Sequence, residues 1–288
     1  MDTIFQRISI LGLGLIGGSW GLSLSKHGFQ GKRVGFDRTE VTRRALALGA
    51  IDETAASWED AVREADLIIL ATPVGSILDL LPKLQGRVSS GALITDVGST
   101  KEVIYRRARE IFGKNPLFLG GHPMTGKERS GLENAEAGLL TGARYVLTPL
   151  APEHLDDPRF KAFRELLETL EARPIISDAE AHDRSAAYLS HLPQLLSSGL
   201  ASLIEEEAIG KHLPLEMAAA GFRDMTRLAE SPYSVWRDIC LTNRKNIQAA
   251  LDALIQKLEI LKLHLSDLEL EGEFKKALQL RQKLRDLG

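Results

Sequence analysis

One glycine motif near the N-terminus constrains the fold more than any other feature of the sequence. The run G-L-G-L-I-G at residues 12–17 follows an apolar stretch, residues 8–11, and opens a helical segment that reaches Leu24. In a strand–turn–helix unit the first glycine permits the tight turn, the second lets a ligand approach the backbone, and the third allows close packing of helix on strand. The free N–H groups at the helix start attract phosphate. This context disfavours a tight turn without a ligand and predicts a dinucleotide site built by Gly12, Gly14, Leu15, Ile16 and Gly17.

The rest of the first half predicts a parallel sheet. Short apolar runs alternate with amphipathic helical stretches, and the run at residues 66–71 is apolar on both faces. Strands that are buried on both faces and separated by helices are typical of a parallel sheet with right-handed crossovers. We therefore predict an α/β, doubly wound, mainly parallel Rossmann domain over residues 1–178. Strands are expected at residues 8–11, 33–37, 66–71, 92–96, 117–120, 145–148 and 174–177, and helices at 39–48 and 157–172.

Strand signals end near residue 178, and long helical patterns follow. The clearest pattern alternates steps of three and four residues through Ile247, Leu251, Leu254, Leu258, Leu261, Leu265 and Leu268. Such a heptad seam is narrower than the apolar stripe of a helix on a globular core, and it usually needs a partner of equal length. We therefore predict an all-α substrate-binding and dimerisation domain over residues 179–288, and a homodimer formed through the C-terminal helices. Packing of this helix on its own domain is the alternative.

Composition excludes several classes of protein. The formal net charge of −3 over 288 residues argues against a nucleic-acid surface, which needs clustered Lys and Arg. No apolar run approaches the roughly 20 residues that cross a bilayer, so no membrane partner is expected. The single cysteine, Cys240, cannot form an internal disulfide, and the N-terminus leads directly into a strand pattern. We therefore expect a cytoplasmic protein, and no metal site is expected.

The end of the second predicted strand indicates which dinucleotide binds. Asp37 lies 25 residues beyond Gly12, close to where a ribose-binding acid is expected. Its carboxylate accepts hydrogen bonds from ribose hydroxyls and repels a 2′-phosphate, which favours NAD over NADP. The neighbouring Arg38 could instead pair with a phosphate. Alternatively, Asp37 serves only as a favourable charge at the start of the next helix. The loop with Thr72 and Pro73 is expected to lie along the cofactor.

Two polar loops should gather at the same edge of the sheet. One is D-V-G-S-T-K at residues 96–101, and the other is the glycine-rich segment at residues 120–131. The second loop carries His122 at a strand end, where a side chain with an unperturbed pKa near 6.5 suits general-base catalysis. The hydroxyl of Ser99 is in a position to orient this histidine. A purely structural strand-end histidine is the alternative.

These loops also carry a resemblance to a known family. Together with H-D at residues 182–183, S-H-L-P at 190–193 and F-R-D-M-T-R at 222–227, they are similar to motifs of the prephenate/arogenate dehydrogenase family, and the similarity covers nearly the whole chain. The resemblance implies NAD-dependent oxidative decarboxylation of prephenate to 4-hydroxyphenylpyruvate, in tyrosine biosynthesis.

The resemblance also implies roles for individual residues. His122 takes the proton of the ring hydroxyl, and Ser99 hydrogen-bonds His122. Arg227 matches the family arginine that grips the ring carboxylate, a role that suits a bidentate cation. A helix-surface arginine is its alternative reading. Ser190, His191 and Glu128 belong to the substrate pocket and its mouth, although His191 is equally well explained as a buried structural histidine.

One position departs from many relatives. They carry a histidine after S-H-L-P, whereas this chain has Gln194. A neutral amide suits the keto group of prephenate better than the ammonium group of arogenate, so Gln194 favours prephenate. Three rivals remain: an arogenate or dual-specificity cyclohexadienyl dehydrogenase, a β-hydroxyacid-type dehydrogenase, and a non-catalytic NAD sensor. The absence of lysine between Glu180 and Glu207, where the β-hydroxyacid enzymes place a catalytic lysine, weighs against the second rival.

Overall fold

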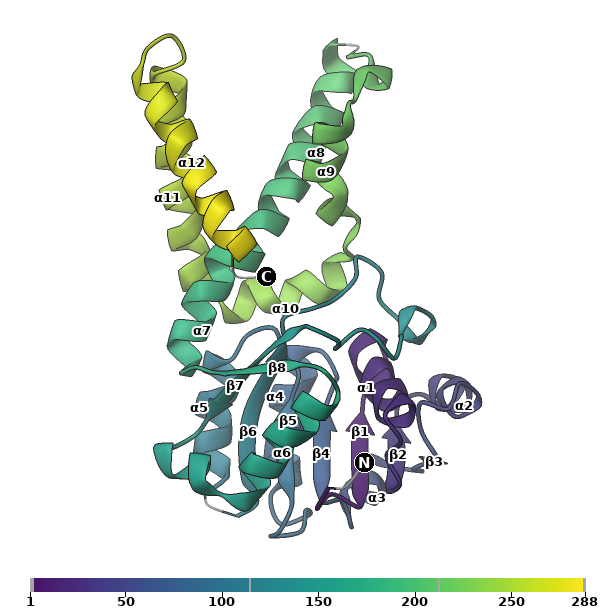
Figure 1. The fold of residues 1–288 in the computed structure, drawn as a ribbon. Helices are drawn as coiled ribbons and strands as arrows, with labels where there is room; N and C mark the ends of the chain where they lie inside the picture. The colour runs from purple at the N-terminus through teal and green to yellow at the C-terminus, as the bar shows by residue number, and fades with distance from the viewer. Residues whose placement is uncertain (1–2, 114, 212, 287–288) are drawn as a thin grey trace.

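The computed structural model describes residues 3–113, 115–211 and 213–286 and contains one eight-stranded sheet. The strand order is β3-β2-β1-β4-β5-β6-β7-β8 (Figure 1). Strands β1 to β6 are parallel, whereas β7 and β8 run in the opposite direction. The strands are β1 (Arg7–Leu11), β2 (Lys32–Phe36), β3 (Glu53–Thr54), β4 (Leu67–Leu70), β5 (Leu93–Asp96), β6 (Leu117–Pro123), β7 (Arg144–Pro149) and β8 (Arg173–Ile176). The predicted doubly wound, mainly parallel domain is confirmed.

Helices cover both faces of this sheet, as the buried strands require. Strand β4 has every side chain buried, because apolar layers lie on either side of it. One layer includes Trp20, stacked on Phe163 with ring centroids 6.0 Å apart, and the other includes Ile77 and Phe118. The helices of this region are α1 (Leu15–Lys26), α2 (Thr39–Ala47), α3 (Trp58–Val62), α4 (Val74–Leu84), α5 (Glu102–Ile111) and α6 (Pro158–Thr169). Strand β3 was not predicted, because it has only two residues and both are polar.

The described chain is helical after β8. After β8 the chain enters α7 (Ala179–Ala186), where the Asp178 side chain accepts the Ala181 N–H at 2.7 Å. A π-helical turn, Ala187–His191, joins α7 to α8 (Leu192–Lys211) in one continuous helix. Pro193 has no N–H to donate to the carbonyl four residues earlier, which explains why the regular ladder is interrupted there. The remaining helices are α9 (Ala220–Thr226), the 3₁₀ helix Arg227–Glu230, α10 (Tyr233–Thr242), α11 (Arg244–Leu263) and α12 (Glu269–Asp286).

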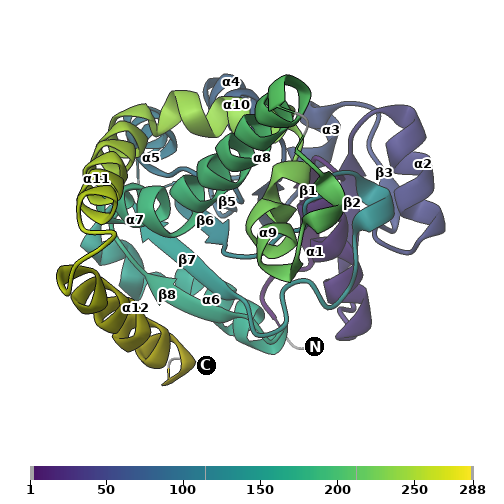
Figure 2. The same ribbon diagram turned by 90° about the horizontal axis from the view of Figure 1, so that it is seen from above.

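The helices form two arms above the sheet. Figure 1 shows the α8–α9 pair and the α11–α12 pair rising from the carboxyl edge of the central strands, and Figure 2 shows from above that the two pairs stand apart. Helix α10 crosses beneath them. No helix among the described residues is sufficiently long and apolar to span a lipid bilayer.

The leucine seam does not continue through one helix as expected. Helix α11 ends at Leu263, so Leu265 and Leu268 lie in the turn before α12. In that turn His264 Nδ1 lies 2.7 Å from Asp267 Oδ2, and Asp267 Oδ1 accepts the Glu269 N–H at 3.0 Å. These local hydrogen bonds compete with the helical ladder and start a new helix. The seam therefore covers α11 only, and α12 folds back beside it.

Candidate active site

The glycine turn has the geometry that the motif predicts. Gly12 has φ of +95°, and a Cβ there would lie 2.6 Å from the carbonyl carbon of Ala71. A Cβ on Gly17 would lie 1.9 Å from the Gly12 oxygen. Only glycine fits at these two positions, so helix α1 begins directly against the end of β1.

The space around this turn fits a dinucleotide. A Cβ built on Gly14 meets nothing within 4 Å, and no side chain caps the N-terminus of α1 at Leu15 and Ile16. The N–H groups of that first turn are thus free for an anion. Across the loop the hydroxyl of Thr72 is buried and has no hydrogen-bond partner among the described residues, while the neighbouring Pro73 is exposed and is the N-cap of α4. An unsatisfied buried hydroxyl is unfavourable and fits a site that a ligand completes.

Asp37 faces the glycine turn. Its Oδ2 accepts the Leu13 N–H at 2.8 Å, and its Oδ1 accepts the Arg38 N–H at 2.7 Å. The N-cap position of α2 is Arg38, with no side-chain hydrogen bond to the helix, so Asp37 does not cap that helix. The carboxylate therefore lies at the carboxyl end of β2, where a ribose is bound in this fold. The Arg38 side chain is 88% exposed and extends into solvent beside it.

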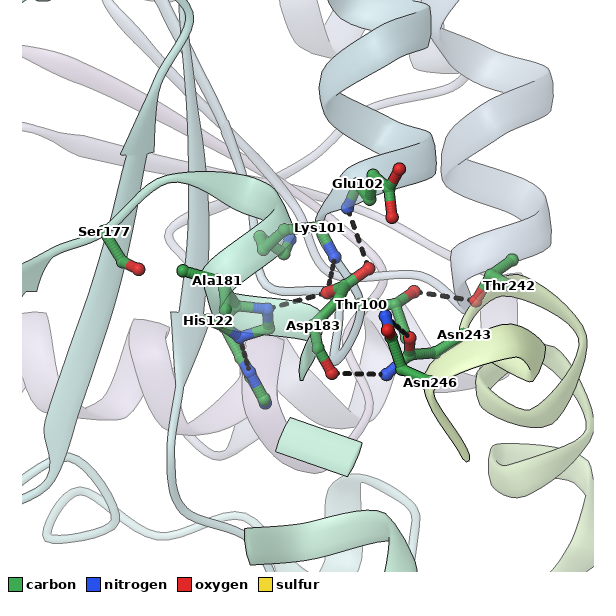
Figure 3. A network of polar contacts seen from close by, with 12 residues as sticks. Thr100, Lys101, Glu102, His122, Ser177, Ala181, Asp183, Thr242, Asn243 and Asn246 are labelled. Atoms are coloured by element: carbon green, nitrogen blue, oxygen red, sulfur yellow. Dashed lines mark hydrogen bonds and ion pairs between the residues drawn. The ribbon is translucent and has the colours of Figure 1, made fainter. Parts of the chain in front are cut away.

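His122 lies near the end of β6 in a buried hydrogen-bonded chain. Its Nδ1 is 2.8 Å from His182 Nε2, and His182 Nδ1 is 2.8 Å from Asp183 Oδ1. The two rings meet edge to face with centroids 5.1 Å apart. Figure 3 shows Asp183 at the centre of this network, between His122 and the start of α5. The sequence predicts His122 as the base, and the structure shows that its hydrogen-bond partner is His182 of α7.

The environment keeps His122 uncharged. Burial is the main cause that lowers the pKa of His122 well below 6.5, and the nearby His182, Lys101 and His191 lower it further. A neutral imidazole has a free lone pair, which is the state that a general base needs.

A fully buried ion pair supports the end of β6. Lys101 Nζ contacts Asp96 Oδ2, and neither side chain is exposed. Asp96 also accepts the Gly98 N–H at 2.8 Å and the Gly121 N–H at 3.2 Å. Burial lowers the pKa of Lys101, and the carboxylate of Asp96 opposes that effect. The pair thus fastens the 96–101 loop to the residue before His122.

Ser99 does not make the contact that was expected. It is partly exposed, and within the described parts of the chain no hydrogen bond joins its hydroxyl to His122. The Nδ1 position is taken by His182 instead. The signal for His182 was present in the H-D pair at residues 182–183, but its spatial neighbour could not be inferred from a position 60 residues away.

Arg227 and Glu128 form an ion pair at the outer side of the site. Arg227 begins the 3₁₀ helix and is 61% exposed, and its Nη1 contacts Glu128 Oε1 in the loop after β6. Gln194 binds the 3₁₀ helix that contains Arg227, since its Nε2 donates to the Leu228 carbonyl at 2.8 Å. The same Nε2 also donates to Ser198 Oγ within α8 at 3.2 Å. The amide nitrogen of Gln194 is thus committed to these two acceptors in the protein.

His191 and Ser190 lie in the π-helical turn. His191 is fully buried, its Nδ1 is 3.2 Å from Asn243 Nδ2, and its Nε2 has no hydrogen-bond partner in the described parts of the chain. Burial lowers the pKa of His191 to about 4. Trp236 meets this ring edge to face with centroids 5.9 Å apart and so packs against His191. Ser190 is partly exposed beside it.

The helical region is fastened to the sheet at this edge. Asp238 Oδ2 accepts the Gly75 N–H at 2.8 Å, and Thr242 Oγ1 is 2.8 Å from Thr100 Oγ1. A dinucleotide turn and a buried uncharged base on one edge of a sheet provide for hydride and proton to move together. The molecule therefore belongs to the class of nicotinamide-dependent oxidoreductases.

Comparison with known proteins gives the family. Two family models match: the nucleotide-binding domain of prephenate dehydrogenase over residues 20–176, and the prephenate dehydrogenase dimerization domain over residues 178–280. Prephenate dehydrogenase of Lactococcus lactis is 37% identical over 268 residues, which are 92% of this chain and 71% of that protein. The chain belongs to the prephenate dehydrogenase family, and it is an NAD-dependent oxidoreductase.

Two solved structures are similar over nearly the whole chain. The crystal structure of prephenate dehydrogenase from Aquifex aeolicus, in complex with hydroxyphenyl propionate and NAD+, has a TM-score of 0.84 and 31% identity and covers 100% of both chains. The crystal structure of Synechocystis arogenate dehydrogenase has a TM-score of 0.76 and 30% identity, and it covers 97% of this chain and 99% of that one. The family thus includes members named for either substrate.

Replacing Asp37 tests the choice of cofactor. Asp37→Asn keeps an oxygen that can accept the Leu13 N–H but removes the charge that repels a 2′-phosphate. We expect the ratio of kcat/KM for NAD over NADP to fall at least about tenfold, the effect of one charged hydrogen bond. Steady-state kinetics with each cofactor measure this ratio. Adding Arg38→Ala should reverse any gain with NADP, and an unchanged ratio in Asp37→Asn would contradict the assignment.

Proposed function

We propose that this chain catalyses the NAD-dependent oxidative decarboxylation of prephenate to 4-hydroxyphenylpyruvate, with His122 as the general base. The observation that carries the proposal is the buried, uncharged His122 on the same sheet edge as the glycine turn. The family membership and the hydroxyphenyl propionate of the Aquifex structure support it, because that ligand is a phenol with a three-carbon acid, like the product.

The reaction needs alignment and one base. The glycine turn, the Thr72–Pro73 loop and Asp37 would hold NAD, which would supply the acceptor for the hydride from C4 of the ring. His122 takes the proton of the C4 hydroxyl, and the bond from C1 to the ring carboxylate breaks to release carbon dioxide. The electrons of that bond complete the aromatic ring, and the phenolate oxygen at C4 then takes back the proton held by His122. Aromatisation drives the step, so the protein contributes mainly orientation and proton acceptance.

Arg227 is proposed to bind the ring carboxylate. Its guanidinium already contacts a carboxylate, that of Glu128, which is a chemically similar partner. The substrate would replace Glu128 on the bidentate face of the arginine. Ser190 and His191 are proposed to line the pocket. Ser99 is proposed to lie near the nicotinamide, and Gln194 to act by fixing the segment that follows Arg227.

A homodimer in the cytoplasm is also proposed. The family description of residues 178–280 as a dimerization domain supports the dimer. So do apolar side chains that remain exposed on the α11–α12 arm, among them Leu258, Phe274 and Leu278. The single cysteine supports a reducing compartment. Light scattering on the purified protein tests the dimer, and a monomer at micromolar concentration would contradict it.

The substrate is tested by offering prephenate and arogenate separately, each with NAD and with NADP. We expect rapid NADH formation with prephenate and NAD, and at least about tenfold lower kcat/KM with arogenate, because the Lactococcus lactis relative that is 37% identical is a prephenate dehydrogenase. Absorbance of the reduced cofactor measures turnover. A preference for arogenate would retain the base and the arginine but reverse the substrate.

Replacing the base tests its role. His122→Asn should lower kcat by about 10²–10⁴-fold, the usual contribution of a general base. NAD affinity should change little, because His122 is three strands away from the glycine turn in the sheet order. Turnover kinetics and a fluorescence titration with NADH measure the two quantities. Normal turnover in this variant would remove His122 from the mechanism.

The pH profile tests the state of the same residue. The pKa of His122 is lowered well below 6.5, so the unprotonated base persists into mild acid and is lost only as the pH falls through that lowered pKa. We expect the acid limb of kcat/KM to lie below pH 6.5. Initial rates with saturating NAD across the acid range measure it. An acid limb above that value would show that another group controls the reaction.

Two replacements of Arg227 test substrate binding. Arg227→Ala removes a charged, bidentate partner of the ring carboxylate, so KM for prephenate should rise by about 10–100-fold. Arg227→Lys keeps the positive charge but loses the bidentate guanidinium, so its KM should lie between that of the unchanged enzyme and that of Arg227→Ala. Steady-state kinetics give both values. An unchanged KM in Arg227→Ala would exclude this residue from the carboxylate site.

A further inference from the structure

The carboxylate of Asp183 accepts three hydrogen bonds in the buried region near His122. Its Oδ1 accepts the Lys101 N–H at 2.6 Å and its Oδ2 accepts the Glu102 N–H at 3.0 Å, both at the start of α5. Its Oδ1 also lies 2.8 Å from His182 Nδ1. The carbonyl of the same residue accepts Asn243 Nδ2 at 2.7 Å. Asp183 is therefore held on several sides, and its oxygens have fixed positions.

These fixed acceptors determine where the protons of the two histidines lie. A carboxylate only accepts, so His182 Nδ1 must donate to Asp183. When His182 is neutral it carries one N–H, and its Nε2 is then an acceptor. His122 Nδ1, which is 2.8 Å from that acceptor, must then be the donor. By the same rule His122 Nε2 has a lone pair and no proton.

We propose that His182 and Asp183 are positioning residues that fix the tautomer of His122, so that its Nε2 is the atom that takes the proton of the substrate hydroxyl. This inference rests on the proposed role of His122 as the base. After proton transfer both nitrogens of His122 carry hydrogen. The Nδ1–H still donates to His182, so the new positive charge remains hydrogen-bonded through His182 to the carboxylate of Asp183.

Without the hydrogen bonds from His122 through His182 to Asp183, the orientation of the His122 ring is not defined. The other groups that lower the pKa of His122 are Lys101, whose ammonium group is paired with Asp96, and His191, which pairs with Asn243. Among the described residues only His182 hydrogen-bonds a ring nitrogen of His122. A His122 ring that lost this partner could rotate or carry its proton on Nε2, and in that form it could not accept the substrate proton.

His182 is the position to change, because Asp183 also holds the start of α5. His182→Leu removes both hydrogen bonds of the chain. His182→Gln is the matched control, since one amide carries both a donor and an acceptor and can replace both bonds. We expect kcat to fall at least about tenfold in His182→Leu, but by no more than the about 10²–10⁴-fold expected for loss of the base itself, and to recover in large part in His182→Gln. Affinity for NADH, measured by fluorescence titration, should be unchanged in both and reports that each variant is folded.

The tautomer is read directly by nitrogen NMR of the protein labelled with 15N-histidine, with signals assigned through His122→Asn. We expect His122 of the unchanged protein and of His182→Gln to carry hydrogen on Nδ1, and His122 of His182→Leu to lose that preference. A proton on Nε2 of His122 in the unchanged protein would overturn the proposal, as would equal losses of kcat in the two variants. Since the spectra need no turnover, they stand apart from the base assignment, which fails separately if His122→Asn is fully active.

Discussion

The buried carboxylate of Asp183 is the constraint on which the rest of the site depends. It satisfies backbone donors at the N-terminus of α5, where the helix dipole favours a negative charge. It comes from α7, so the same contact joins the helical region to the sheet. Removing one partner of a buried charge typically costs about 3–5 kcal/mol, so this joint has little freedom to shift. A rigid joint is useful here, because the base and the cofactor turn come from the sheet, whereas the arginine comes from the helices.

The uncharged state of His122 at the end of β6 depends on how the two nearby buried carboxylates, Asp96 and Asp183, are already paired. Asp96 is used by Lys101 and by backbone donors, and Asp183 by α5 and His182. Neither is left to pair directly with His122. Burial therefore dominates, and the imidazole stays neutral although a lysine lies close to it. Lys101 can be buried completely because its ammonium group is paired with Asp96, whose carboxylate is fixed by the Gly98 and Gly121 amides.

Much of this arrangement can be predicted from sequence, and the limits have physical reasons. The glycine turn, Asp37 and the parallel strands follow from local patterns, since their partners lie in the same βαβ unit. His182 could not be assigned to His122, because that pairing depends on how α7 docks on the sheet. The sequence predicts that Gln194 contacts the substrate, whereas in the structure its amide binds the Leu228 carbonyl, in a segment whose path no local pattern predicts. The leucine spacing predicts one helix that continues past Leu263. In the structure α11 ends there, because His264 and Asp267 form local hydrogen bonds in the turn that follows.

The π-helical turn at Ala187–His191 has a consequence for how this chain tolerates change in length. A π-helical turn holds one residue more than an α-helical turn, and one residue corresponds to a rotation of about 100° around the helix axis. Deleting a residue between His182 and Gln194 would restore a regular helix but turn α8 by about that angle. Gln194 would then swing away from Leu228, and the segment with Arg227 would lose its support, while His182 stayed in place. The twelve-residue separation between His182 and Gln194 thus sets how the part of the active site on the sheet is aligned with the part on the helices.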